Sequence, residues 1–354
     1  MPACAYVLRV IDVGTSIDLG VAEAALSAKR APELLAGPLG GGTGGVRLAT
    51  GPVDVELGER TVAGRKTLAR ARLFDFGIAS FRFELALEGL SPAALVALGA
   101  EIEDDGGFDL AARDAWAALK GRLGQAVKEP IAAEHIEDYA VFVLPRDPDE
   151  GGSPGDTVTR LLLGEDQPRP LAKEQVKAAT RRAIRYFADD LVVVDYDAAV
   201  VIDPACATEL VDLFELATAH LLELRYYDAL LAKASRGIAE DAARASRGRW
   251  LFRSPFAAVA GRAAHLLLEL TEMTDTFQRS ITLLGDAHSV LVYRAVEKRF
   301  RIPELQRAVD EKLASVARSA EVLGDLVHDR RGLFLEATVV LLITVEIGLA
   351  LLHR

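Results

Sequence analysis

The 354-residue sequence has little sulfur and few aromatic residues: it contains two cysteines and two methionines, and aromatic residues make up 6% of it. Cys4 and Cys206 are too few for a disulfide framework or a metal cluster, which favours a reducing compartment. Residues 1–10 lack the basic region and the apolar run of a signal peptide. No cysteine–histidine or serine–histidine pair has the local spacing of a catalytic site, so we expect no enzyme activity and no cofactor.

Positive charge is also in deficit, because the net charge is −11. The excess of acidic residues is concentrated in residues 1–205, whereas residues 206–354 are close to neutral. An acidic surface repels phosphate groups, so we expect no direct contact with nucleic acid. Hydrophobic residues make up 51% of the chain, which is enough for a sizeable aliphatic core, and the length suits two domains.

Segments typical of strands and of helices alternate in residues 1–203. The clearest strand lies within Leu73–Leu85, where Phe81 and Phe83 alternate with polar residues, as in a strand with one exposed face. Ser91 and Pro92 provide an N-cap and a first-turn proline for a helix through Ala100. The other predicted strands are Ala5–Val13, Val46–Leu48, Val53–Leu57, Glu137–Leu144 and Asp190–Ile202, and the other predicted helices are Val21–Arg30, Leu110–Lys128 and Leu171–Phe187. Pro145–Pro170 is predicted to be mostly loop. The fold class is therefore α+β, with residues 1–203 forming a head domain around a mixed or antiparallel sheet, and a ferredoxin-like arrangement fits this pattern.

The pattern changes at Asp203-Pro204, which favour the start of a helix. Three later segments carry apolar residues at alternating spacings of three and four, the period of a coiled coil. Their seams are Leu210, Leu213, Ala217, His220, Leu224, Tyr227, Leu231, Ala234 and Ile238; Val259, Ala263, Leu266, Leu270, Met273, Phe277, Ser280, Leu284, Ala287 and Leu291; and Val309, Leu313, Val316, Ala320, Leu323 and Val327. We therefore expect three long helices that form a coiled-coil stalk over residues 204–331.

Residues 332–354 form the third predicted part of the chain, a C-terminal transmembrane segment. Thirteen of the twenty residues 333–352 are Leu, Ile, Val or Phe, and a helix of this length spans ~30 Å, the thickness of a bilayer core. Glu336 and Glu346 oppose insertion, and their positions on one arc of the helix predict contact with a partner helix or water rather than lipid. The alternative is a buried helix in a soluble oligomer.

Several of these segments resemble a known family. Leu73–Ser80, the helix around Leu216–Leu231, and Leu305–Leu313 leading to the apolar run 335–347 are similar to the "required for meiotic nuclear division" family. The resemblance implies a membrane-anchored oligomer linked to translation or membrane organisation, and it carries over no catalytic residues. The absence of an Arg-rich presequence and the Ala-, Arg- and Gly-rich composition favour a bacterial relative, with the bulk of the chain in the cytoplasm at the inner membrane.

Two functions from different classes fit the pattern. The first is a non-enzymatic, membrane-anchored scaffold or tether that forms a homo-oligomer through Glu336 and Glu346. The second is an ion channel or transporter, since magnesium transporters of the CorA type also join an α+β head to long helices; the chain lacks their Gly-Met-Asn motif. His265, Glu269 and Glu272 lie on one helical face and are weak candidates for a metal site, although an exposed polar flank explains them more simply.

Overall fold

The structure is a computed structural model, and the residues that it describes are 3–31, 34–35, 45–104, 106–131, 135–149, 155–181, 183–204, 209–247, 281–284 and 288–319, with single positions between 261 and 343. The chain divides into two compact units. The first contains Met1–Leu224 and Asp275–Pro303, and the second contains Arg225–Thr274 and Glu304–Arg354. The predicted division into parts 1–203, 204–331 and 332–354 stays a prediction.

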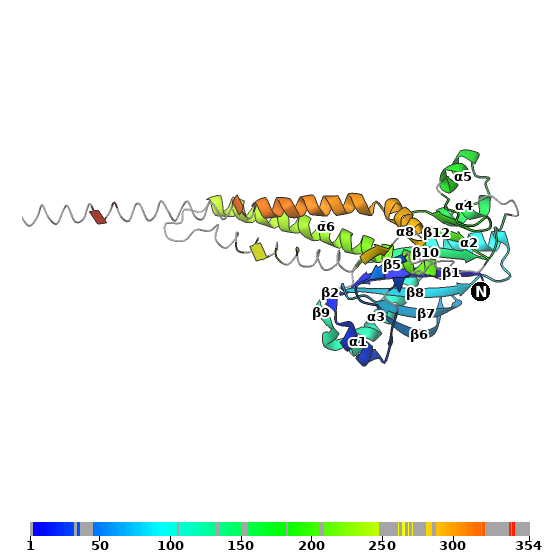
Figure 1. Ribbon diagram of the computed structural model, residues 1–354, viewed down its shortest axis with the longest axis horizontal. Helices are drawn as coiled ribbons and strands as arrows, with labels where there is room; N and C mark the ends of the chain where they lie inside the picture. Colours follow the sequence, from blue (N-terminus) through cyan, green and yellow to red (C-terminus); the bar gives the residue numbers. More distant parts are fainter. Residues whose placement is uncertain are drawn as a thin grey trace, which may run out of the picture. The chain divides into compact units, whose positions relative to one another are not determined.

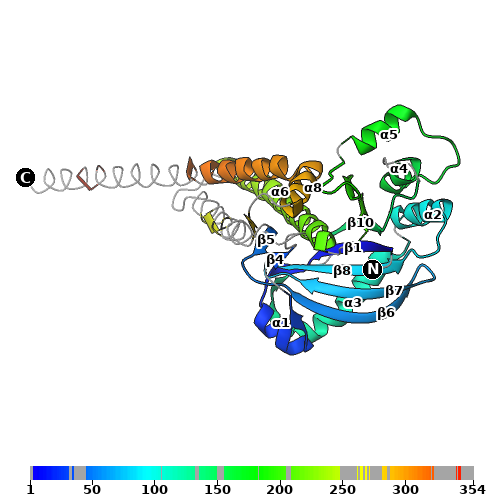
Figure 2. The ribbon, with the colours of Figure 1, turned by 45° about the vertical axis from the view of Figure 1, so that its right-hand side comes forward.

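An eight-stranded sheet forms the centre of the first unit, with the strand order β11-β12-β10-β1-β8-β7-β6-β3. These strands are β1 (Cys4–Asp12), β3 (Lys29–Arg30), β6 (Val53–Val62), β7 (Arg65–Leu73), β8 (Ile78–Ala86), β10 (Ile136–Leu144), β11 (Leu191–Val194) and β12 (Ala198–Ile202). The pairing of β10 with β12 is parallel and the other pairings are antiparallel, so the predicted α+β class with a mixed sheet is confirmed. Figures 1 and 2 show β6, β7, β8 and β1 in succession across the sheet. The central sheet is larger than the predicted ferredoxin-like arrangement, because it has eight strands and a ferredoxin-like unit has four.

Two smaller sheets lie outside this central sheet. One has the order β13-β5-β4, and the other pairs β2 with β9. Their bounds are β2 (Gly14–Ile17), β4 (Leu34–Leu35), β5 (Gly45–Leu48), β9 (Val127–Pro130) and β13 (Ile281–Leu284). β2 is held against the turn between β7 and β8, because the amides of Val13 and Ile17 donate to the carbonyls of Gly77 and Asp75 at 3.0 and 2.9 Å.

One face of the central sheet packs into an apolar core with the early helices. These are α1 (Leu19–Leu26), α2 (Pro92–Glu103), α3 (Phe108–Leu123) and α4 (Asp156–Leu163). Alternate strand residues such as Val7, Phe81 and Phe142 belong to this core, together with Leu98 and Trp116 from the helices. The predicted cap of α2 is confirmed, since the hydroxyl of Ser91 accepts a hydrogen bond from the Ala94 amide at 3.2 Å.

The opposite face of the sheet is also covered, which corrects the prediction of an exposed strand face. Arg82 alternates with Phe81 and Phe83 on β8, yet it is only 8% exposed. It contacts residues near the start of α6 (Glu209–Arg247), and α8 (His288–Arg299) lies in the same unit. Polar alternation along a strand therefore does not mark a solvent face here, because ion pairs allow charged residues to be buried.

Several predicted boundaries were wrong. The segment 145–170 contains α4, and α5 (Lys173–Thr180) is much shorter than the predicted helix Leu171–Phe187. The predicted strand Asp190–Ile202 is the antiparallel pair β11 and β12, joined by a turn at residues 195–197. The helix predicted for Val21–Arg30 ends at Leu26, where Ser27 adopts a left-handed conformation, and α3 ends at Leu123 before a 3₁₀ turn, η1 (Gly124–Ala126), that leads into β9. The errors at α1, α3 and α5 concern the ends of elements, where tertiary contacts outweigh local propensity. The other two are a helix missed inside a predicted loop and a turn missed inside a predicted strand.

The second of the three predicted long helices was wrong in its later part. Its proposed seam runs through Leu284, but Ile281–Leu284 form β13, which pairs antiparallel with β5. The exposed fraction of Leu291, another seam position, is 47%. A run of apolar and β-branched residues fits a short strand as well as a helix, and the pairing with a segment more than 230 residues earlier decided the outcome.

The first and third predicted helices are helical where the structure describes them. Residues 209–247 form α6, and residues 302–319 are helical as well. Seam residues of α6 in the second unit are buried, as are Val309 and Val316, and Lys312 pairs with Asp228 at 2.5 Å. No helix within the described part of the chain is long and apolar enough to cross a membrane. Most of the predicted segment 333–352, including Glu336 and Glu346, lies outside the described residues.

Candidate functional site

The candidate site is a cluster of five charged residues on the face of the central sheet that α6 covers. Two arginines come from neighbouring strands, Arg72 from β7 and Arg82 from β8. Asp54 stands opposite Arg72 in the register of β6 and β7. Asp212 and Glu215 come from the first turns of α6, three residues apart, and therefore point from the same side of the helix. We call these five residues the charge clamp.

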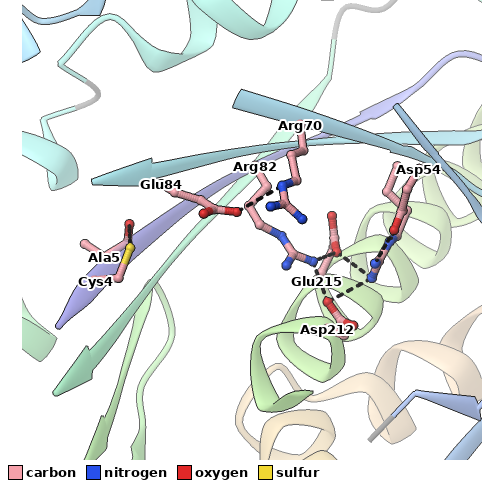
Figure 3. Close-up of polar contacts among 9 residues, drawn as sticks. Cys4, Ala5, Asp54, Arg70, Arg82, Glu84, Asp212 and Glu215 are labelled. Carbon is pink, nitrogen blue, oxygen red and sulfur yellow. Dashed lines mark hydrogen bonds and ion pairs between the residues drawn. The ribbon is translucent and has the colours of Figure 1, made fainter. Parts of the chain in front are cut away.

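The geometry of the charge clamp is that of a closed network. Arg72 binds Asp54 with two parallel hydrogen bonds, Nε to Oδ1 at 2.6 Å and Nη2 to Oδ2 at 2.9 Å. Its Nη1 lies 2.9 Å from Asp212 Oδ1 and 3.1 Å from Glu215 Oε2. The Nη2 of Arg82 lies 2.5 Å from the same two oxygens. Figure 3 shows Arg82 directed toward Asp212 and Glu215 on the helix, and Asp54 lies on the other side of these two residues from Arg82. Each arginine therefore bridges the sheet to α6.

The side chains at the centre of the charge clamp are almost fully buried, and this burial affects their pKa values. The side chain of Glu215 is 1% exposed and those of Arg72 and Arg82 are 10% and 9% exposed. Burial alone would lower the pKa of each arginine, but the neighbouring carboxylates outweigh it, and both pKa values lie above the usual range. Glu215, Asp54 and Asp212 raise the pKa of Arg72, and Glu215 and Asp212 raise that of Arg82. Burial would raise the pKa of Asp212, and the two arginines reverse that shift and lower it. All three groups are therefore charged at neutral pH.

This arrangement joins α6 to two neighbouring strands of the central sheet. Both guanidinium groups are engaged by carboxylates, and three acidic residues face two arginines, so the cluster carries one net negative charge. A buried ion pair adds little net stability but fixes geometry, because any other register of the helix would leave charges buried and unpaired. The charge clamp therefore specifies where α6 lies on the sheet.

The site residues predicted from the sequence are placed elsewhere or not described. His265 is helical and exposed in the second unit, whereas Glu269 and Glu272 lie outside the described residues, as do Glu336 and Glu346. No group of three or more histidine, cysteine, aspartate or glutamate residues in the described part of the chain is arranged to hold a metal ion. The metal candidates and the contact role of the two C-terminal glutamates stay predictions.

Sequence reasoning missed the charge clamp, although a signal was present. Glu215 follows Leu213 and Phe214 in one of the most apolar parts of α6, where an acid is costly unless it is paired. Arg72 and Arg82 alternate with apolar residues on two consecutive strands. Charged residues at these positions are expected to be buried and therefore paired. The sequence does not show which residues pair with one another, because the partners lie up to 143 residues apart in the chain.

Comparison with known proteins finds a matching family for most of the first unit. The sequence profile of a family described as "Uncharacterized protein MJ0711, N-terminal domain" matches residues 3–208. The uncharacterized protein MJ0711 of Methanocaldococcus jannaschii is 25% identical over 230 residues, which cover 64% of this chain and 69% of that protein. The matched region contains the whole central sheet and both arginines of the charge clamp.

This match overturns the resemblance to the "required for meiotic nuclear division" family, which was wrong. Its most specific part was the apolar run at 335–347, and apolar helices resemble one another because they draw on few residue types. The matched profile instead covers more than half of the chain, through segments of mixed composition. The chain belongs to the family of uncharacterized protein MJ0711, through its N-terminal domain.

Proposed function

We propose that this chain is a non-enzymatic scaffold that is anchored to a membrane by residues 333–352 and assembles with further copies of itself. The observation that carries the proposal is the exposure of Val340, Leu342 and Ile343, which are helical and 63%, 62% and 50% exposed. At 100° per residue, Leu342 lies 200° from Val340, so apolar side chains are exposed on opposite sides of this helix. A helix that is apolar all round is covered by lipid or by protein.

The rest of the chain supports a scaffold because its charged and apolar contacts connect elements. The charge clamp fixes the start of α6 on the central sheet, and residues 225–247 of the same helix belong to the second unit. There the buried Leu231, Val309 and Val316, with the pair Asp228–Lys312, fit the coiled-coil pairing expected from the seams. The proposed place of the chain is the cytoplasmic side of the membrane, and its proposed partner is a second copy.

The deciding experiment is membrane fractionation with carbonate extraction. We expect the full chain to remain with membranes and a chain that ends at Arg331 to be released. Leu342→Arg should also release it, because an arginine at mid-helix costs about 2.5–3.5 kcal/mol and removes the favourable term of leucine. The matched control is Leu291→Arg, the same substitution at an exposed leucine on α8, which should leave the distribution unchanged.

Full-length protein that stays soluble and monodisperse without detergent would contradict membrane anchoring. It would favour the buried helix of a soluble oligomer, in which Leu342→Arg disrupts assembly rather than sedimentation with membranes. If carbonate releases the full chain, and Leu342→Arg changes neither its sedimentation with membranes nor its assembly, both the membrane anchor and the buried helix are rejected.

A further inference from the structure

The two faces of the central sheet differ in how well their buried polar groups are satisfied. The face toward α1–α4 is lined by the apolar core, in which Val7, Phe81 and Phe142 alternate along their strands. The residues between them point to the face covered by α6 and α8, which contains the charge clamp. Buried side-chain atoms without a hydrogen-bond partner among the described residues include Asp12 Oδ2, Ser80 Oγ, Glu215 Oε1, His288 Nδ1, Tyr293 Oη and Arg299 Nε.

Each of these atoms belongs to the second face or to a helix that covers it. Asp12 and Ser80 alternate with the core residues Ile11 and Phe81 on β1 and β8, and Glu215 lies on α6. His288, Tyr293 and Arg299 lie on α8. A buried polar atom without a partner costs free energy that it would regain in water. This layer therefore gains hydration on opening, and the apolar core on the other face does not.

The contacts of Tyr139 couple α6 to α8. Tyr139 is 1% exposed on β10, its ring stacks on Phe214 of α6 at 5.6 Å, and it meets Phe300 edge-on at 5.2 Å, directly after α8. Its hydroxyl donates to the carbonyl of Asp195 at 3.1 Å, and the carboxylate of Asp195 pairs with Arg299. One residue of the sheet thus packs against both covering segments, which share this point of attachment.

We propose that residues 209–224 of α6 and α8 form a releasable layer, which opens from the central sheet as one unit while the α1–α4 side stays folded. The charge clamp sets the register to which α6 returns, because only that position pairs Asp212 and Glu215 with Arg72 and Arg82. In the open state Arg72 keeps Asp54 as its partner on the sheet. The opening is a sub-global transition of the first unit.

Hydrogen exchange of the full chain, followed by mass spectrometry, tests this proposal. The reporters are the amides of residues 210–224 and 289–299 for the layer, and of 93–103 and 109–123 for α2 and α3. We expect the first two segments to exchange together and at least about tenfold faster than the other two, the ratio that a stability difference of ~1.4 kcal/mol produces. Equal protection of all four segments would overturn the proposal, because only global unfolding would then expose α6 and α8.

A matched pair of tyrosine variants gives the second readout. Tyr293 and Tyr139 are both 1% exposed, but the hydroxyl of Tyr293 has no partner among the described residues and that of Tyr139 is bonded. Tyr293→Phe should slow exchange of the layer by roughly five- to tenfold, and Tyr139→Phe should speed it by a similar factor, with α2 and α3 unchanged. Equal shifts in all four segments, or shifts of the same sign for both variants, would overturn the proposal.

Discussion

At the scale of single residues, Asp12 makes stability depend on pH. Asp12 is 5% exposed at the end of β1, and burial raises its pKa to about 7 against the opposing hydrogen bond from the Gly14 amide. Because the folded pKa is raised, the folded chain binds the proton more tightly, and stability falls as the pH rises from about 4 to about 7. Asp12→Asn removes this loss, so the variant should exceed the original chain in stability by up to about 4 kcal/mol at pH 8.

Urea unfolding at pH 4.5 and pH 8 measures this difference. The gap between Asp12→Asn and the original chain should be small at the lower pH and large at the higher one. Asp18→Asn is the control, because Asp18 caps α1 through the Gly20 and Val21 amides and asparagine caps equally well. A gap for Asp12→Asn that is the same at both pH values would show that the carboxyl does not titrate in this range.

The charge clamp also makes a prediction at the residue scale. Arg82→Met leaves Asp212 and Glu215 with one arginine instead of two, and removing one partner of a buried ion pair typically costs about 3–5 kcal/mol. Adding Glu215→Leu to Arg82→Met removes a buried carboxylate that has lost one of its arginine partners. The double variant should therefore recover more than half of the stability lost in Arg82→Met. Chemical denaturation of the two single variants and the double variant measures the coupling.

An exposed ion pair serves as the control for this cycle. Arg65 and Glu101 lie 2.7 Å apart with side chains 45% and 34% exposed, so Arg65→Met should cost less than about 1 kcal/mol. Strictly additive costs for Arg82→Met and Glu215→Leu would mean that the two residues do not act on each other. The role of the charge clamp in setting the position of α6 would then fail.

At the scale of elements, the turn between β7 and β8 depends on a glycine. Gly77 has a φ of +88°, and a Cβ there would lie 1.8 Å from the carbonyl oxygen of Gly14, the first residue of β2. Gly64, in the turn between β6 and β7, has a φ of +73° but open space around it. Gly64→Ala should therefore cost only the backbone strain of about 1–2 kcal/mol, whereas Gly77→Ala should cost at least about 2 kcal/mol more.

Thermal unfolding of these two variants separates steric overlap from backbone strain. Gly64→Ala should lower the melting temperature modestly. Gly77→Ala should lower it further, because it should also weaken the hydrogen bonds of Val13 and Ile17 to the turn between β7 and β8. Equal losses in the two variants would indicate that β2 can move away from the turn at no cost.

At the scale of the whole molecule, the apolar run 333–352 predicts assembly. Glu346 lies within this run, and a glutamate in an apolar setting requires a polar partner, which we expect a second copy of the chain to provide. Light scattering of the detergent-solubilised full chain should report a homo-oligomer, and a chain that ends at Arg331 should associate more weakly. Glu346→Gln keeps the hydrogen bond and should preserve the oligomer, whereas Glu346→Leu should loosen it. A monomeric full chain at micromolar concentration would refute assembly.

Features with a local cause could be predicted from the sequence. The β-rich composition of Ala5–Val13 predicted β1, Ser91 and Pro92 predicted the start of α2, and the three–four spacing from Leu210 to Ile238 followed the buried side of α6. These features depend on residues within a few positions of one another, where propensity, capping and periodicity act. The α+β class of the first unit follows from the same local patterns.

The pairing of distant segments could not be predicted from the sequence, because it depends on long-range contacts. Ile281–Leu284 became a strand because β5 offered an edge, and Arg82 became a buried residue because α6 brought Asp212 and Glu215 to it from 130 and 133 residues away. The spacing of apolar residues does not distinguish a short strand from a helix, and an arginine between two phenylalanines has the same sequence pattern whether it faces water or a carboxylate. The choice depends on the free energy of contacts made after the chain has folded back on itself, and that free energy is a property of the assembled layers rather than of any one segment.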